Sequence, residues 1–184
     1  MRRNGPLLAV AITAAALSTG CSNEPAHWTE TDRAFVARMI PHHHLGMTLV
    51  DEATVNSDDV RLRRLVFEMS GYHQSELDRL MEWADSHGID AAGDFPGHLP
   101  DDDIAALASL DGAEHDIWWL DLMLRHHRGA VQMADAELAS GQIDEVRDLA
   151  DTVRRVQSDE IEQMDGLRRA LCAEQPAGTR TAGC

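Results

Sequence analysis

The sequence predicts an all-α protein, a four-helix bundle built from two repeated helical hairpins. Apolar residues recur at helical spacing between residues 30 and 173, and no stretch there alternates with period two for long enough to form a strand. Glycine and Asn/Ser/Asp clusters divide this region into four long segments. The sequence also matches itself, without gaps, at an offset of 84 residues.

The repeat units are residues 31–87 and 112–173. Because the offset is constant, the two helical hairpins should have the same geometry. A single hairpin cannot bury its own apolar face, so we expect the two units to pack together into one bundle. The aligned pairs include Asp32 with Asp116, His42-His43 with His126-His127, Gly46 with Ala130, Leu65 with Leu149, Glu76 with Glu160 and Leu77 with Ile161.

The first hairpin should begin near residue 31. Thr31 or Asp32 can cap a helix that runs to about residue 55, where Asn56-Ser57-Asp58 interrupts the pattern. A second helix of residues 59–86 ends before Gly88. Proline inside a helix removes a backbone hydrogen bond, so we also expect a kink at Pro41.

The second hairpin follows a longer crossover connection. Residues 88–100 contain three glycines and two prolines, which predicts a loop, and a short helix should follow over residues 101–110. Two long helices, over residues 112–139 and 144–173, are then separated by Gly141.

The N-terminal residues resemble an export signal rather than a part of the fold. Met1-Arg2-Arg3 is basic, and residues 7–17 are uncharged and apolar or small. This run is too short to span a membrane, which needs about 20 apolar residues. Small residues before Cys21 resemble a bacterial lipobox. We therefore predict a lipoprotein signal peptide over residues 1–20, lipidation of Cys21, a tether over residues 21–30, and an extracytoplasmic protein anchored to the cell membrane.

Charge and the remaining cysteines restrict the partners. The formal net charge of −16 would repel phosphate backbones, which argues against a nucleic-acid binder, and would attract cations. An extracytoplasmic location permits a disulfide between Cys172 and Cys184, which would hold the tail of residues 174–184 against the last helix. The alternative is that the two thiolates serve as soft metal ligands.

Polar side chains on the apolar helix faces are the candidate functional residues. His42 and His126 lie at mid-height on the apolar stripes of the first and third long helices, and His43 and His127 lie about 100° around each helix. The partner helices carry Glu76 and Glu160 on their apolar faces. A buried carboxylate is costly unless it is paired or binds a cation. We therefore predict metal ligands at His42, His43, His126, His127, Glu76 and Glu160.

Three further residues complete this predicted site. Met39 and Met123 lie one helical turn before the histidine pairs, and His73 lies one turn before Glu76. Imidazole and carboxylate are common ligands of first-row transition metals, and thioethers favour Cu(I), so copper is preferred and zinc or iron is possible. The alternative is structural: Glu76 and Glu160 form buried ion pairs with histidine, and the methionines fill the core.

The doubled His-His motif resembles a known family. Residues 39–47 (MIPHHHLGM) and 123–134 (MLRHHRGAVQMA) are similar to the signature M-I-x-H-H-x-x-A-[IV]-x-M-A of a bacterial family, domain of unknown function 305. Residues 74–77 (QSEL) and 157–164 (QSDEIEQM) resemble its Q-x-x-E-I-x-x-M pattern. The resemblance covers roughly residues 30–171. It implies a ferritin-like fold and export, and copper binding as in some members, with the matched candidates at His42, His43, His126, His127, Met39 and Met123.

The first repeat departs from the family pattern. Leu49-Val50 stands where Met-Ala is usual, so we expect the two halves to bind metal unequally. Three functions remain open from the sequence. The first is an exported, lipid-anchored metal-binding protein that buffers, stores or confers resistance to copper. The others are a ferritin-like metal-dependent oxidase and a non-catalytic structural lipoprotein whose histidines only make core hydrogen bonds.

The sequence supports the metal-dependent oxidase less well than the metal-binding protein. A di-iron bundle uses Glu-x-x-His on two helices, whereas His73-x-x-Glu76 runs in the opposite order and is not repeated. The chain also shows no Ser/His/Asp order, nucleotide loop or deaminase-type zinc signature. We therefore predict no catalytic residues.

Overall fold

The computed structural model describes residues 27–176 and Cys184, and all regular structure in that part of the chain is helical. The all-α class and the two-hairpin architecture are therefore confirmed. The predicted signal peptide and the lipidation site at Cys21 lie outside the described residues. The helices are α1 (Glu30–Asn56), α2 (Val60–His87), α3 (Asp101–Leu107), α4 (Gly112–Ser140) and α5 (Asp144–Glu174).

The start of α1 differs from the prediction. Thr29 is the N-cap, because its hydroxyl oxygen accepts a hydrogen bond from the Asp32 amide while the Asp32 carboxylate accepts one from the Thr29 amide. The expected cap at Thr31 or Asp32 was thus wrong, since Asp32 serves as the third residue of a capping box. The short helix also ends earlier than expected, at Leu107 rather than near residue 110.

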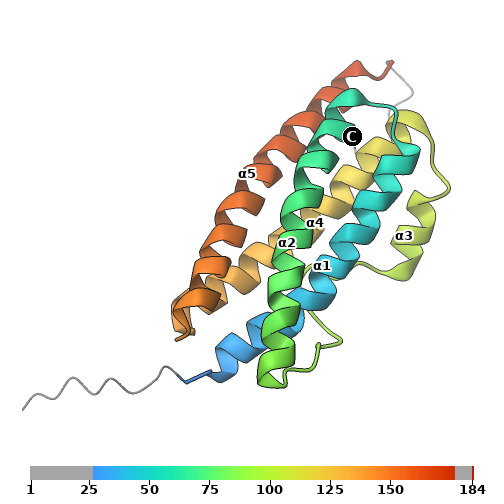
Figure 1. Ribbon diagram of the computed structural model, residues 1–184. Helices are drawn as coiled ribbons and strands as arrows, with labels where there is room; N and C mark the ends of the chain where they lie inside the picture. Colours follow the sequence, from blue (N-terminus) through green and yellow to red (C-terminus); the bar gives the residue numbers. More distant parts are fainter. Residues whose placement is uncertain (1–26, 177–183) are drawn as a thin grey trace, which may run out of the picture.

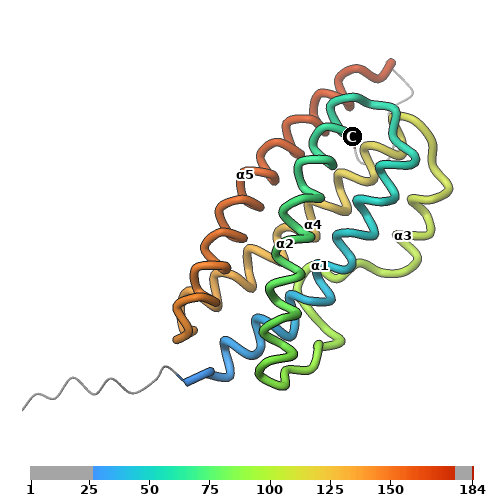
Figure 2. The backbone as a smooth tube through the Cα atoms, in the orientation of Figure 1, coloured from blue at the N-terminus to red at the C-terminus, as the bar shows by residue number. Residues whose placement is uncertain are grey.

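The long helices form two hairpins that meet along one inner pair. Helix α1 packs against α2, and α4 packs against α5 (Figure 1). The two hairpins are joined through α1 and α4. Helices α2 and α5 make few contacts, among them the Arg61–Glu174 ion pair, and they diverge toward the lower end of the view in Figure 2. The inner helices run antiparallel. His42 of α1 faces His126 of α4, and two turns later in α1, but two turns earlier in α4, the Trp119 indole N–H donates to the Leu49 carbonyl at 2.7 Å.

The crossover loop compensates for the proline in α1. Pro41 lacks the amide hydrogen that would bond the Ala37 carbonyl, and the Ala92 amide of the loop donates to that carbonyl instead, at 2.8 Å. Helix α1 continues through Pro41 as one element. Farther along, Gly97 has a φ of 83° and lies directly against Gly129 of α4, where a side chain on either residue would collide with backbone atoms.

The apolar core is split into two clusters. One cluster includes Leu49, Met69 and Trp119, and the other includes Phe35, Leu80 and Val153. Each of the four long helices contributes to both clusters, with a gap between its two contributions. These gaps fall at the same height, so polar side chains must occupy the middle of the bundle.

A disulfide holds the C-terminal residue against the last helix. It joins Cys172 of α5 to Cys184, and the two Cα atoms lie 5.5 Å apart. Among the described helices, none combines the length and apolar character that crossing a bilayer would require.

Candidate metal centre

A buried polar layer crosses the middle of the bundle between the two apolar clusters. Each long helix contributes two of its members, and all are at most 6% exposed. Within residues 27–176, seven of the nine buried side-chain nitrogen and oxygen atoms that lack a hydrogen-bond partner belong to this layer. Unpaired buried polar atoms are costly, so their concentration here indicates a ligand site. The members of the polar layer are His42, His43, His73, Glu76, His126, His127, Gln157 and Glu160.

His42 and His126 join the two hairpins. Their rings stack with centroids 3.6 Å apart, and each Nε2–H donates to the other residue's backbone carbonyl, at 3.0 and 2.9 Å. A carbonyl only accepts hydrogen bonds, so Nε2 carries the hydrogen in both rings and Nδ1 holds a lone pair. Both Nδ1 atoms are buried and have no partner among the described residues.

His43 and His127 each contact a carboxylate of the partner helix. The His43 Nε2 lies 2.8 Å from a Glu76 oxygen, and the His127 Nε2 lies 2.8 Å from a Glu160 oxygen. In addition, the Nδ1–H of His43 donates to the Met39 carbonyl at 3.1 Å, whereas the Nδ1 of His127 is unpaired. These contacts are the Glu–His pairs that the structural alternative expected, and the same atoms are available to a cation.

His73 is one of two residues of the layer, with Gln157, whose side chains make no hydrogen bond to any described residue. Its side chain is almost fully buried, and both ring nitrogens lack a partner within residues 27–176. Its ring lies between those of His43 and His127, with centroids 5.2 and 5.6 Å away. A buried imidazole without partners is destabilising unless something else occupies its lone pair.

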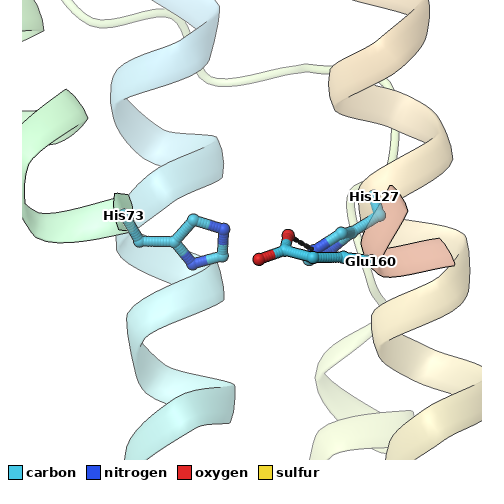
Figure 3. Close-up of side chains that lie close together, drawn as sticks. All are labelled: His73, His127 and Glu160. Carbon is cyan, nitrogen blue, oxygen red and sulfur yellow. Dashed lines mark hydrogen bonds and ion pairs between the residues drawn. The ribbon is translucent and has the colours of Figure 1, made fainter. Parts of the chain in front are cut away.

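His73, His127 and Glu160 come together as a three-residue cluster. One ligand atom from each residue lies within 4.8 Å of the other two, and all three side chains are buried. Figure 3 shows the His73 ring of α2 directed at the Glu160 carboxylate of α5, which also contacts His127 of α4. Two imidazole nitrogens and one carboxylate oxygen are a donor set suited to copper or zinc.

Burial favours the neutral imidazole for three histidines of the polar layer, His42, His73 and His126. Burial lowers the pKa values of His42, His73 and His126 well below the ordinary value of 6.5, and the neighbouring imidazoles lower them further. These rings therefore present lone pairs at neutral pH, as metal ligation requires.

Gly46 provides the space for this arrangement. A Cβ atom at this position would lie 3.0 Å from Cε1 of His126 and 3.3 Å from Nδ1 of His73. Phe95 of the crossover loop packs edge-on against His42, with the ring centroids 5.6 Å apart. The absence of a side chain at Gly46 and the packing of Phe95 thus both restrict the orientation of the neighbouring imidazole rings.

Not all of the predicted ligands lie in the polar layer, and one residue of the layer was not predicted. Met39 and Met123 are fully buried, and they belong to the two different apolar clusters on either side of the polar layer. Gln157 was missed as a candidate, although the repeat aligns it with His73. Its amide is buried with both polar atoms unpaired.

A further buried acid, Glu137, ends the apolar stripe of α4 and was not predicted as a candidate from the sequence. It is completely buried, and neither of its carboxylate oxygens has a hydrogen-bond partner within the described chain. Burial and the adjacent Asp32 raise the pKa of Glu137 to about 7. This residue lies far along α4 from the polar layer, near the start of α1 and α5.

A surface pocket reaches the polar layer at Glu160. It has a volume of about 210 Å³ and lies where α2 and α5 separate. Glu68 and Tyr72 of α2 and Asp159 of α5 line it. Glu160 also lines it, so this residue belongs both to the three-residue cluster and to the pocket.

Comparison with solved structures identifies proteins of the same fold. A DUF305 protein from Streptomyces coelicolor, described as secreted, superposes with a TM-score of 0.73 at 23% identity, over 83% of this chain and 96% of its own. A DUF305 fragment from Deinococcus radiodurans gives 0.72 and 24%, over 80% and 99%. CopM in its Cu(I)-bound form gives 0.68 and 23%, over 77% and 98%, and CopM has also been crystallised with Cu(II) and with silver.

No curated protein sequence matches the chain. A family model described as a domain of unknown function, DUF305, does match it, twice in succession, over residues 14–84 and 85–168. Two consecutive matches agree with the internal duplication and together cover most of the sequence. The chain therefore belongs to the DUF305 family.

Proposed function

We propose that this protein is an extracytoplasmic metal-binding protein that holds copper in its polar layer and acts in copper buffering, storage or resistance. The observation that carries the proposal is His73, a buried imidazole that lies beside His127 and Glu160 and has no hydrogen-bond partner in the described part of the chain. The copper-bound and silver-bound structures of CopM, which shares the fold, support copper as the ion.

The residues present fit such an ion. A divalent cation between His73 and the His127–Glu160 pair would take the place of the hydrogen bond within that pair and would bind the lone pair on Nε2 or Nδ1 of His73. The second carboxylate oxygen of Glu160 can neutralise part of the charge. His42 and His126 orient the neighbouring rings by bridging α1 and α4, and their Nδ1 atoms are further candidate donors.

The test is metal binding by the purified chain that starts at Cys21, with Cys21 replaced by Ser. We expect isothermal titration with Cu(II), and with Cu(I) under anaerobic conditions, to show at least one tight equivalent. The variant His73→Ala should lose that equivalent. His44→Ala is the matched control, because His44 lies on α1 beside the motif but is exposed. Failure of the wild type to bind copper, zinc or iron would leave the structural role for the histidines.

We further propose that the protein is held at the cell membrane by a lipid on Cys21. The basic start and the apolar run of residues 7–17 support this placement. In the native host, Cys21→Ser should move the protein from the membrane fraction to the soluble extracytoplasmic fraction. An unchanged membrane fraction would contradict the lipid anchor without affecting metal binding.

A further inference from the structure

We propose that the polar layer holds a second, weaker cation site formed by His43, Glu76 and the amide oxygen of Gln157. This inference rests on the proposed function, because it assigns a second ligand set to the same layer. The first site is the cluster of His73, His127 and Glu160.

The two sites are related by the internal repeat. An offset of 84 residues converts His43 into His127, Glu76 into Glu160 and His73 into Gln157. The structure preserves this relation in the contacts of the layer. Both His–Glu distances are 2.8 Å, and the rings of His42 and His43 are as far apart as those of His126 and His127, at 5.9 Å. The internal repeat therefore relates the residues of one ligand set to those of the other, and the His–Glu pair of each set has the same geometry.

Gln157 supplies the independent evidence for a ligand. Its side chain is only 2% exposed, and neither the amide oxygen nor the amide nitrogen has a partner among the described residues. A residue that only filled the core would be apolar, because an unpaired buried amide is destabilising. Its equivalent, His73, is unpaired in the same way. Both positions thus hold a donor that lacks a partner in the protein.

The histidine of the second site is oriented for ligation. The Nδ1–H of His43 donates to the Met39 carbonyl at 3.1 Å, which directs Nε2 and its lone pair toward Glu76. Histidine ligands commonly donate their other ring N–H to a carbonyl or carboxylate in this way. Nε2 and the Glu76 carboxylate oxygen, which lie 2.8 Å apart, are the two donors that a divalent cation would share.

The two sites differ in donor chemistry. The first offers two imidazole nitrogens and one carboxylate oxygen, whereas the second offers one nitrogen and two oxygens. Imidazole binds Cu(II) and Zn(II) more strongly than a neutral amide oxygen does. Loss of an outer-shell partner alone costs about 10–100-fold in metal affinity, so we expect the second site to be at least about tenfold weaker.

The experiment is a Cu(II) titration of four forms of the full extracytoplasmic chain: the wild type, Gln157→Leu, Gln157→His and the control Gln74→Leu, whose glutamine is exposed on α2. The wild type and the control should take two equivalents in two steps. Gln157→Leu should take one, and Gln157→His should tighten the second step at least about tenfold, because it gives the second site an imidazole.

Retention of two equivalents by Gln157→Leu would overturn the second site, as would a second step that Gln157→His leaves unchanged. A single equivalent in the wild type, removed by His73→Ala, would overturn the second site while leaving the proposed function intact. The absence of any Cu(II) binding would overturn both proposals. Circular dichroism of each variant confirms that the helices are present.

Discussion

At the scale of single residues, the space beside the polar layer is kept open at a cost in helix stability. Gly46 shows this most clearly, since a glycine in the middle of a helix is destabilising by roughly 0.5–1 kcal/mol relative to alanine. Here the missing side chain leaves room for His73 and His126. The His126 ring cannot easily move away, because it stacks on His42 and donates to its carbonyl.

We therefore expect Gly46→Ala to weaken copper binding by at least tenfold, a loss of about 1.4 kcal/mol in binding free energy. The added methyl group would displace the His73 ring from His127 and Glu160. Gly71→Ala on α2 is the matched control, because no atom lies within 4 Å of its added Cβ. It should bind copper normally and gain roughly 0.5–1 kcal/mol in stability. Equal copper affinities for the two variants would contradict the packing role of Gly46.

At the scale of the helices, the composition and the positions of helix-breaking residues allowed most of the fold to be predicted. Glycine and polar breaks placed the long helices to within one or two residues at most ends, because these residues act locally through capping and backbone conformation. The partners of each polar group could not be predicted, because they depend on helices that are distant in sequence. Asp32 and Asp116 are equivalent in the repeat, yet Asp32 accepts from the backbone amides of Gln142 and Ile143, whereas Asp116 accepts from His115.

The same reason applies to the candidate site. The sequence predicted the residue types and their burial, since histidine and glutamate on an apolar stripe must face the core. It treated the four histidines of the two His-His motifs as equivalent ligands. The structure divides them, because the crossing of α1 and α4 brings each of His42 and His126 against the other's carbonyl while His43 and His127 face the outer helices.

The junction of three helix ends should make stability depend on pH. Glu137 of α4 faces Asp32 of α1 and Arg147 of α5. Burial on its own would raise the pKa of Asp32, but hydrogen bonds from Thr29, Ile143 and Gln142 lower it to about 2, so this carboxylate remains ionised near neutral pH. Burial and this neighbouring charge raise the pKa of Glu137 from 4.5 to about 7. Because the folded-state pKa is raised, the stabilising contribution of protonated Glu137 is fully present below pH 4.5 and is lost as the pH rises through about 7.

Replacement of Glu137 by Gln should therefore stabilise the protein at alkaline pH. One pKa unit corresponds to about 1.4 kcal/mol, so the free energy of unfolding at pH 9 should rise by up to about 3 kcal/mol. At pH 4.5 the two proteins should differ little. Urea unfolding of both proteins between pH 4.5 and 9 measures the effect, and a difference that does not change with pH would show that Glu137 does not titrate in this range.

At the scale of the whole molecule, the polar layer divides the core and the repeat gives it two unequal halves. The α1–α4 pair is the rigid axis, because reciprocal histidine bonds and the Trp119–Leu49 bond connect its helices. The outer helices α2 and α5 carry the carboxylates and the residues that distinguish the halves, His73 and Gln157. An acidic protein of net charge −16 would also concentrate cations near these carboxylates.

The separation of α2 from α5 has a kinetic consequence. Glu160 reaches both the buried cluster and the solvent-facing pocket, so an ion can be exchanged through the side of the bundle while the inner helices stay paired. Transfer of bound Cu(II) to excess EDTA should thus be much faster than global unfolding, as timed by hydrogen exchange of α1 and α4 amides. Equal rates would mean that the bundle must open completely to release its cargo. Under the proposed function, such access from the side would let one folded molecule load and unload its ion many times.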